Sequence, residues 1–290
     1  MTTWLVTGAG GALGRDLVEL LTDSSASVVG LDHHALDVTN PDSIRRALDE
    51  VGPDVVVNTA AYTRVDDAEA NEAEANAVNG DAPGLLAVEC AAIGARFIHL
   101  STDYVFAGDA TQPYEVDAAV SPKSAYGRSK ALGETAIFAR APGADAHVVR
   151  TAWLYGGTGS SFVRAVGGRL RHGQAVDVVN DQRGAPTWTR DLAAQLIALG
   201  KADVAAGVWH CSARGQATWF DVAVALAEEI GCDPALVRPT TSATLDRPAP
   251  RPAYSVLSHR TWDEAGLPVM RHWRDALHVA FDQLGDALTT

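Results

Sequence analysis

The chain opens with the run Thr3-Trp4-Leu5-Val6-Thr7 and continues directly into Gly8-Ala9-Gly10-Gly11-Ala12-Leu13-Gly14. The first run predicts a buried strand, and residues 16–21 have the spacing of a helix. Gly8, Gly11 and Gly14 lie between the two. Glycines at a strand-to-helix turn let the backbone approach a pyrophosphate at a helix N-terminus. This stretch therefore predicts a dinucleotide-binding turn at the start of an α/β fold.

Further apolar runs alternate with helical segments along the first half of the chain. They predict strands at 28–31, 55–58, 96–100 and 147–151, separated by helices at 65–79, at 81–93 and from about 125 to 142. Such alternation is typical of a doubly wound parallel sheet of the Rossmann type. A strand at 208–210 can complete the sheet.

Beyond residue 156 the alternation weakens, and we expect a smaller, interleaved C-terminal α/β lobe that binds the substrate. It would contain helices at 218–230 and 273–284 and a proline-rich, mostly irregular stretch at 234–254. The predicted division gives residues 1–152 and about 175–211 to the dinucleotide-binding domain. The substrate-binding lobe then consists of about 153–174 and 212–290.

Asp32 ends the second predicted strand. A carboxylate there can accept hydrogen bonds from an adenosine ribose and repels a 2′-phosphate, which favours NADH over NADPH. His33 and His34 follow directly and would soften this repulsion, unless they are two exposed loop histidines. Asp37 and Val38 are placed to contact an adenine, although Asp37 fits equally well as a cap for the next helix.

A second polar cluster begins where the fourth predicted strand ends, at Ser101-Thr102-Asp103-Tyr104-Val105-Phe106. Ligands bind at this edge of open α/β sheets. Farther on, Tyr126 and Lys130 are four residues apart and share one helix face. An ammonium beside a phenol favours the phenolate, so we expect Lys130 to lower the Tyr126 pKa and suit it to proton transfer with a substrate oxygen. A Tyr-x-x-x-Lys pair alone is more often an exposed helix face; the accompanying motifs favour a catalytic pair.

Composition excludes several kinds of partner. The net charge of −13 argues against nucleic acid and anionic membranes. Cys90, Cys211 and Cys232 are far apart and have no metal-ligand spacing. No charged, apolar leader and no run of about 18 apolar residues is present. We therefore expect a reduced, soluble, cytoplasmic protein without a metal site.

Together these motifs resemble the extended short-chain dehydrogenase/reductase superfamily, and within it the dTDP-4-dehydrorhamnose reductase family. The similar segments are 101–106, 150–155, 181–187 and 251–257, which follow the family's order over nearly the whole chain. The resemblance implies that dTDP-4-dehydro-6-deoxy-L-mannose (dTDP-4-dehydrorhamnose) is reduced to dTDP-L-rhamnose. The hydride would come from NADPH or NADH, since members of the family often accept both.

The resemblance also implies roles for individual residues. Tyr126 would donate the proton to the C4 oxygen, Lys130 would hold the nicotinamide ribose, and Thr102 would hydrogen-bond the substrate oxygen. Asp103 and Trp153 would contact the sugar nucleotide. The implied cofactor contacts, taken with the glycines of the turn, are Gly8, Gly11, Ala12, Leu13, Gly14, Asp32, Asp37, Val38, Ala61, Tyr62 and Thr63, together with Tyr126 and Lys130.

Trp153 and Arg251 also have physical arguments of their own. A flat indole at the sheet edge suits the apolar face of a pyranose or a thymine, and the alternative is a core tryptophan. Arg251 lies in a proline-stiffened loop, where a guanidinium can bind a diphosphate with paired hydrogen bonds. The alternative for Arg251 is a solvated arginine on a surface connection.

The oligomeric state departs from the pattern of some relatives. Some members of the family are dimers bridged by a metal bound to surface glutamates, whereas the matching regions here carry Asp16 and Arg190. An arginine does not bind a cation, so we expect a monomer rather than a metal-bridged dimer.

Other functions fit the sequence less well. A 4,6-dehydratase of this superfamily would carry a glutamate where this chain has Tyr104, and 4-epimerases lack the motif at 181–186. A non-catalytic, cofactor-binding regulatory subunit is disfavoured by the presence of both Tyr126 and Lys130. Reduction of another dTDP-4-keto-deoxysugar, in antibiotic or cell-wall biosynthesis, stays open.

Overall fold

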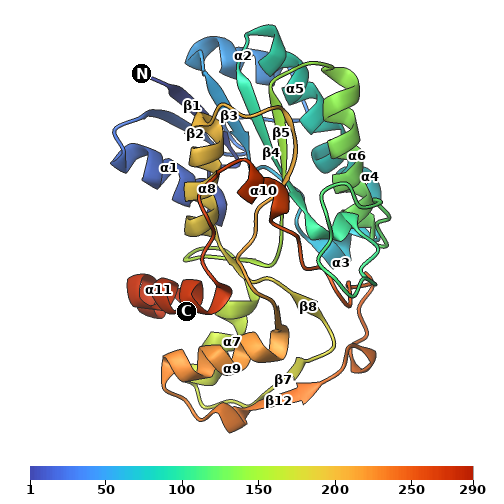
Figure 1. Cartoon of the computed structure of the whole chain (residues 1–290), viewed down its shortest axis with the longest axis vertical. Helices are drawn as coiled ribbons and strands as arrows, with labels where there is room; N and C mark the ends of the chain where they lie inside the picture. Colours follow the sequence, from blue (N-terminus) through green and yellow to red (C-terminus); the bar gives the residue numbers. More distant parts are fainter. Residues whose placement is uncertain (290) are drawn as a thin grey trace.

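A parallel β-sheet organises the larger of two lobes in this computed structural model, which describes residues 1–289 (Figure 1). Its strands lie in the order β10-β5-β4-β3-β1-β2, and all neighbouring pairs are parallel. The order reverses between β1 and β3, and ligands bind at such a switch point. The strands are β1 (Thr3–Thr7), β2 (Ser27–Leu31), β3 (Val55–Asn58), β4 (Arg96–Thr102), β5 (Ala146–Thr151) and β10 (Gly207–His210). The predicted Rossmann-type α/β fold is confirmed.

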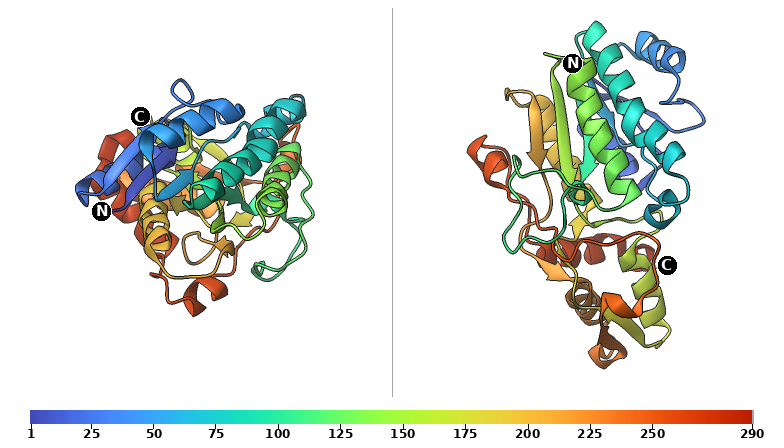
Figure 2. Two further views of the ribbon diagram at one scale, coloured as in Figure 1. Left: turned by 90° about the horizontal axis from the view of Figure 1, so that it is seen from above. Right: turned by 90° about the vertical axis from the view of Figure 1, so that its right-hand side faces the viewer.

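Helices cover both faces of this sheet (Figures 1 and 2). Side chains alternate along each strand, so Val6 of β1 packs into one layer and Leu5 into the other. Both layers are apolar, which explains why the strands form uninterrupted apolar runs in the sequence. One layer holds α1 (Ala12–Asp23) and α8 (Thr189–Lys201); the other holds α2 (Pro41–Val51), α5 (Ala82–Ala92) and α6 (Ala125–Arg140).

The predicted single helix at 65–79 is wrong in form. The segment consists of α3 (Val65–Ala68), α4 (Glu72–Ala75) and a π-helical turn, Asn76–Asp81. Asn79 is completely buried, and its side chain bonds the backbone N–H and C=O of Tyr62 at 2.8 and 2.9 Å. One side of the segment, with Ala68, Ala75 and Asn79, therefore belongs to the core, while Ala70 and Ala73 are exposed.

The cap of α2 is Asn40, not Asp37. The Asn40 side chain accepts hydrogen bonds from the N–H groups of Asp42 and Ser43. The Asp37 carboxylate instead accepts from the backbone N–H and hydroxyl of Thr39, at 2.9 and 2.6 Å. Asp37 thus shapes the turn before the helix, and the capping alternative is excluded.

The smaller lobe lies beyond the carboxyl ends of the strands, at the bottom of Figure 1. Its core includes Leu170, Trp188, Leu226 and Leu277. Its elements are β6 (Leu154–Tyr155), α7 (Phe162–Arg171), β7 (Val176–Val179), β8 (Arg183–Gly184), β9 (Thr187–Trp188), β11 (Ala217–Thr218), α9 (Trp219–Ile230), β12 (Val237–Thr240) and α11 (Trp273–Leu284), with 3-10 turns at Pro234–Leu236, Ser242–Thr244 and Gly285–Leu288.

The division between the lobes differs from the expected one at β7. This strand pairs with β12 and contributes Val176 and Val178 to the core of the smaller lobe. The sequence-based division gives about 175–211 to the dinucleotide-binding domain, whereas β7, β8 and β9 belong to the smaller lobe. The chain then returns to the larger lobe for α8 and β10, and again for α10 (Arg260–Glu264), whose Trp262 packs against that lobe's core.

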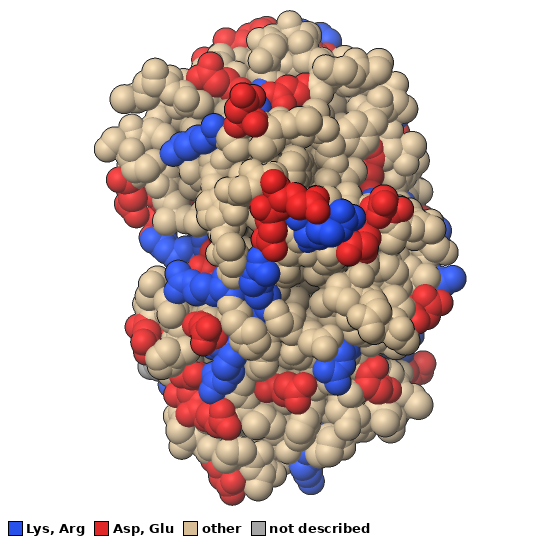
Figure 3. Space-filling view, viewed as in Figure 1, with Lys and Arg blue, Asp and Glu red and all other residues tan. Residues whose placement is uncertain are grey.

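Charged side chains of both signs are interspersed over the face shown in Figure 3. Most arginines have carboxylate partners nearby, for example Arg45 with Glu89 and Arg128 with Glu72. No helix formed by residues 1–289 has the length and apolar character needed to cross a membrane.

Candidate active site

The glycine-rich turn meets the loop after β3 at the switch point of the sheet. Gly8 has a positive φ of 68°, and a Cβ there would lie 2.6 Å from the Ala60 nitrogen, so only glycine fits. Gly11 precedes α1, whose N-terminus has no side-chain cap and no acidic residue in its first turn. The N–H groups of Ala12 and Leu13 are therefore available for an anion such as a pyrophosphate.

Asp32 lies beside this turn, since a Cβ on Gly10 would be 3.6 Å from the Asp32 Cβ. Its Oδ1 accepts hydrogen bonds from the N–H groups of His34 and Ala35, at 2.9 and 3.2 Å, and these bonds hold the pKa of Asp32 below its usual value. His33 and His34 are exposed, as the second interpretation of that pair predicts. The carboxylate is thus ionised and fixed to the loop.

The remaining predicted cofactor contacts lie on the loops after β2 and β3. Val38 is buried and Asp37 is exposed. In the loop after β3, Ala61 is partly buried, Tyr62 is buried and Thr63 is exposed. The Asn79 side chain fixes this second loop by bonding the backbone of Tyr62 on both sides.

Tyr126 is brought to the end of β4 by the start of α6. Ser124 caps the helix by accepting a hydrogen bond from the Gly127 N–H at 3.1 Å. A Cβ on Gly127 would overlap the carbonyl oxygen of Tyr104, so glycine permits the close approach of the helix to the turn after β4. The Tyr126 ring packs edge-on against the Tyr104 ring, with centroids 5.7 Å apart.

Tyr126, Thr102 and Asp103 lie together at the end of β4. Thr102 Oγ1 donates to Asp103 Oδ1 at 3.0 Å, and the Thr102 side chain is near enough to the Tyr126 hydroxyl to affect its pKa. Burial raises the pKa of Tyr126 to about 12, although the Thr102 side chain opposes the shift. Burial also raises the pKa of Asp103 to about 6, opposed by the side chains of Ser255 and Thr102. Tyr126 is therefore a protonated phenol at neutral pH, the form that donates a proton.

Lys130 shares the helix with Tyr126, but its amine is engaged elsewhere. The side chain is buried; Nζ donates to the Leu100 carbonyl at 2.5 Å and lies 3.3 Å from His99 Nε2. Burial lowers the pKa of Lys130 to about 8, with Glu134 acting in the opposite direction. The prediction that Lys130 lowers the Tyr126 pKa is wrong. Burial and the charge of Asp103 raise this pKa and outweigh any effect of the amine.

A buried ion pair behind the site was not predicted. Arg150 of β5 donates to both Glu134 oxygens at 2.9 and 2.7 Å, and the Ser101 hydroxyl donates to Glu134 at 2.5 Å. Arg150 also bonds the Val116 carbonyl at 2.9 Å. The pair thereby joins α6, β4, β5 and the loop at 107–123. An arginine inside an otherwise apolar strand is the sequence signal for it.

Trp153 is held in a stack rather than lying free at the sheet edge. Its indole is parallel to that of Trp219, with centroids 3.6 Å apart and planes 5° apart, and it contacts the backbone at Gly184. Its φ of 48° is in the left-handed region, an uncommon conformation for a residue with a Cβ. Trp153 is partly exposed and packs against the core of the smaller lobe. No sequence motif pointed to Trp219.

Arg251 is paired with Asp66 instead of being solvated. Its two Nη atoms donate to the two Asp66 oxygens at 2.6 and 2.8 Å, and Nη1 also donates to the Ala249 carbonyl. Within residues 1–289 its Nε–H and one Nη2–H have no hydrogen-bond partner. The pair connects α3, which follows the loop after β3, to the proline-rich segment at 234–254.

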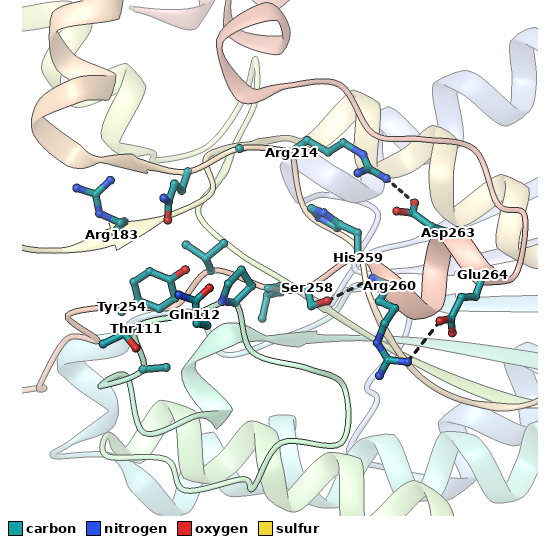
Figure 4. A pocket seen from close by; sticks show the side chains of 16 residues that line it. Thr111, Gln112, Arg183, Arg214, Tyr254, Ser258, His259, Arg260, Asp263 and Glu264 are labelled. Carbon is teal, nitrogen blue, oxygen red and sulfur yellow. Dashed lines mark hydrogen bonds and ion pairs between the residues drawn. The ribbon is translucent and has the colours of Figure 1, made fainter.

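The structure has a cavity of about 1050 Å³ (Figure 4). Tyr126, Lys130 and Thr102 do not line it. Arg183 and Tyr254 are at one end, and the ion pairs Arg214–Asp263 and Arg260–Glu264 are at the other. Tyr254 lines the cavity, whereas the next residue, Ser255, is buried and lies near enough to Asp103 to lower its pKa. Adjacent residues of this extended segment thus face the cavity and the candidate site in turn.

Arg190 forms an ion pair with Glu19 at 2.7 Å and lies 3.9 Å from Asp23. Hydrogen bonding to Thr189 and the charge of Arg190 oppose a burial effect that raises the pKa of Asp16. Across residues 1–289, no three His, Cys, Asp or Glu side chains are grouped so that they could hold a metal ion.

The sequence and the fold were compared with those of known proteins. The family model described as RmlD substrate binding domain matches residues 1–285. The dTDP-4-dehydrorhamnose reductase of Mycobacterium tuberculosis is 48% identical over 95% of this chain and 91% of that protein. The chain belongs to the dTDP-4-dehydrorhamnose reductase family. This confirms the family predicted from the motifs.

Other members and relatives of the reductase family match over similar lengths. A probable dTDP-4,6-dihydroxy-2-methyloxan-3-one 4-ketoreductase from Streptomyces antibioticus is 51% identical over 97% of this chain and 95% of that protein. The solved dTDP-4-dehydrorhamnose reductase of Bacillus anthracis in complex with NADP has a TM-score of 0.92 and 31% identity, covering 97% of this chain and 99% of that one.

Proposed function

We propose that this protein reduces the C4 ketone of dTDP-4-dehydrorhamnose to give dTDP-L-rhamnose, using NADPH or NADH. The observation that carries the proposal is the group of Tyr126, Thr102 and Asp103 at the carboxyl end of β4, two strands from the glycine-rich turn that follows β1. Membership of the reductase family supports the same reaction.

In this proposal Tyr126 is the proton donor. Its raised pKa keeps the hydroxyl protonated until negative charge develops on the substrate oxygen. Thr102 binds the same oxygen and orients the Tyr126 hydroxyl, whose pKa its side chain lowers. The nicotinamide cofactor supplies the hydride, and Lys130 holds its ribose.

Cofactor binding is assigned to the two loops that meet at Gly8. The first-turn N–H groups of α1, among them those of Ala12 and Leu13, would receive the pyrophosphate, and Asp32 would accept from the adenosine ribose. Asp32 favours NADH, while the B. anthracis relative is known in complex with NADP, and so we propose that both cofactors serve. The other assigned contacts are Gly11, Gly14, Asp37, Val38, Ala61, Tyr62 and Thr63.

Substrate binding is assigned to Asp103, Trp153 and Arg251. Asp103 is buried next to Thr102, where it can accept from a sugar hydroxyl. The Trp153 indole, fixed by Trp219, offers its exposed part to an apolar sugar face or a thymine. Arg251 would bind the diphosphate with the two N–H groups that Asp66 does not take.

A second candidate is the reduction of another dTDP-4-keto-deoxysugar. The 51% identity with the S. antibioticus ketoreductase favours it, as does a 47% identical relative named dTDP-4-keto-6-deoxy-D-glucose reductase from Streptomyces niveus. These relatives share the chemistry at C4 and differ in the sugar.

The deciding experiment supplies purified protein with dTDP-4-dehydrorhamnose, or with dTDP-4-keto-6-deoxy-D-glucose, and either reduced cofactor. Loss of absorbance from the reduced cofactor measures turnover, and chromatography with mass and NMR analysis identifies the sugar. The proposal requires dTDP-L-rhamnose as the product of the first sugar, with the larger kcat/KM. Faster turnover of the second sugar would favour the alternative, and no turnover of either would contradict both.

We also propose that the protein acts as a monomer. Arg190, at a position that the family resemblance matches to a metal-binding glutamate, is a cation and is paired with Glu19. Sedimentation equilibrium with and without divalent cations tests this proposal, and a metal-dependent dimer would contradict it.

A further inference from the structure

His99 is a buried histidine that the proposed mechanism does not use. It lies on β4, two residues before Ser101, between Asn58 of β3 and Lys130 of α6. Its Nδ1 is 2.9 Å from Asn58 Nδ2, and its Nε2 is 3.3 Å from Lys130 Nζ. Burial, the larger of the two causes, holds the pKa of His99 well below its usual value, so the ring is neutral.

The hydrogen bonds around Asn58 determine which ring nitrogen carries the proton. Asn58 Oδ1 accepts from the Ala60 N–H at 3.1 Å and from the Thr7 hydroxyl at 2.6 Å. Because a backbone N–H only donates, the amide oxygen is fixed there and Nδ2 faces His99. An amide NH₂ also only donates, so Nδ1 of His99 is the acceptor and its proton is on Nε2.

The Nε2–H of His99 therefore points at the Lys130 amine. A lysine ammonium has donors and no acceptor, so the protonated form would face another donor at 3.3 Å. The neutral amine can accept from Nε2–H while it donates to the Leu100 carbonyl at 2.5 Å. The hydrogen-bond geometry thus favours the unprotonated amine, in the same direction as burial, which lowers the Lys130 pKa to about 8.

The other charged or titratable groups near Lys130 leave this preference in place. Glu134, one turn along α6, favours the ammonium, but both its oxygens are held by Arg150 of β5. Tyr126 is a neutral phenol at pH 7. Asp103, after β4, acts on the pKa of Tyr126 and lies near the side chains of Thr102 and Ser255.

We propose that His99, fixed in its Nε2–H tautomer by Asn58, is a positioning residue that favours the unprotonated amine of Lys130. An arginine at 130 would not serve, because it does not deprotonate. The consequence for turnover rests on the reductase function proposed above: Lys130 would exchange a proton near neutral pH while it holds the ribose. The Asn58 amide, which fixes the His99 tautomer, also accepts a hydrogen bond from the backbone N–H of Ala60, the residue against which Gly8 packs.

The test is a pH titration of the three lysine amines in the full chain, by nitrogen-15 NMR without substrate or cofactor. Lys123 and Lys201 are exposed references. We expect Lys130 to titrate near pH 8, below the ordinary pKa of a lysine. His99→Leu removes the N–H donor, and His99→Gln can turn its carbonyl oxygen to the ammonium. Each should raise the Lys130 midpoint by about one pH unit.

His147→Gln is the matched control. His147 is also buried in the sheet, on β5, but it bonds Trp209 and Asp145 rather than Lys130. This variant should leave the Lys130 midpoint unchanged. An unchanged midpoint in both His99 variants would overturn the proposal, as would an equal shift in the control.

A measurement on the unaltered protein applies if the His99 variants do not fold. Long-range proton–nitrogen correlation spectra identify the tautomer of His99, and we expect Nε2–H from about pH 6 to 9. An Nδ1–H tautomer would contradict the proposal. The outcomes also separate the two proposals, because a shifted Lys130 titration in a protein that reduces no dTDP-sugar would reject only the reductase function.

Discussion

Arg251 and Asp66, 185 positions apart in the chain, are joined by two hydrogen bonds of 2.6 and 2.8 Å between guanidinium and carboxylate. The fork of an arginine fits a carboxylate at two points, which the point charge of a lysine does not. The pair fixes the segment after Ala249 against α3 and aims the remaining N–H groups of Arg251. Together with the bond from the Ala249 N–H to Asp66, it holds the proline-rich segment against α3.

Breaking this pair should weaken substrate binding. Arg251→Lys and Asp66→Asn should each raise the KM for the dTDP-sugar about tenfold with little change in kcat, a difference of about 1.4 kcal/mol. Because Arg251→Lys removes the pair with Asp66 as well as the assigned diphosphate contact, the double variant should be no worse than Arg251→Lys alone. Steady-state kinetics provide the measurement, and effects that multiply in the double variant would show that the two residues act separately.

Tyr126→Phe should lower kcat by about 10²- to 10⁴-fold, since it removes the proton donor. The Kd for NADPH, measured by fluorescence, should change little. Tyr104→Phe is the control, because its ring packs against Tyr126 and its loss of a hydroxyl should leave turnover largely intact. Loss of cofactor binding in Tyr126→Phe would mean that the tyrosine is structural.

Replacing Asp32 should move cofactor preference towards NADPH. Asp32→Asn keeps an acceptor for the His34 and Ala35 N–H groups but removes the charge that repels a 2′-phosphate, and Asp32→Ala removes both. The ratio of kcat/KM for NADPH to that for NADH should rise in both variants. An unchanged ratio would contradict the assigned ribose contact.

The buried pair of Glu134 and Arg150 should behave asymmetrically towards mutation. Glu134→Gln leaves a buried guanidinium without its counter-charge and should lower the free energy of unfolding by about 3–5 kcal/mol. The double variant Glu134→Leu, Arg150→Met should recover part of that loss. Urea unfolding measures both, and a double variant that is less stable than Glu134→Gln would argue against the explanation.

Asp103 should make stability depend on pH. Its pKa is 3.8 in the unfolded chain and about 6 in the folded protein, so the folded state binds more protons between these values and stability falls as pH rises through them. Asp103→Asn removes this effect. The free energy of unfolding of the variant should equal that of the parent below about pH 4 and exceed it by roughly 2–3 kcal/mol at pH 7. A difference in urea stability that does not vary with pH would contradict the assigned shift.

The sequence was sufficient to predict the strands of the sheet and the positions of Gly8, Tyr126 and Lys130 in the fold, because these depend on local patterns. Strands covered on both faces must be apolar throughout, and the close approach at Gly8 requires glycine. A spacing of four residues on one helix was likewise enough to place Tyr126 and Lys130 on α6.

The parts that escaped prediction depend on contacts between distant segments. The Lys130 amine is directed by His99 and Leu100 of a neighbouring strand, and no pattern within α6 reveals this. The stack on Trp153 needs Trp219, which lies far along the chain at the start of α9. The helix expected at 65–79 ends in a π-helical turn in which Asn79 bonds the Tyr62 backbone, a tertiary contact that no local pattern reveals.

The repeated crossing of the chain between the lobes restricts how such a protein can acquire a new substrate. Because α8, β10 and α10 return to the sheet between segments of the smaller lobe, no single cut separates the specificity-determining part from the coenzyme platform. Gene fusion or module exchange would disrupt both halves. Divergence towards other sugars must therefore proceed by individual side-chain replacements, and chimeras of two such reductases should be built by grafting residues instead of swapping whole fragments.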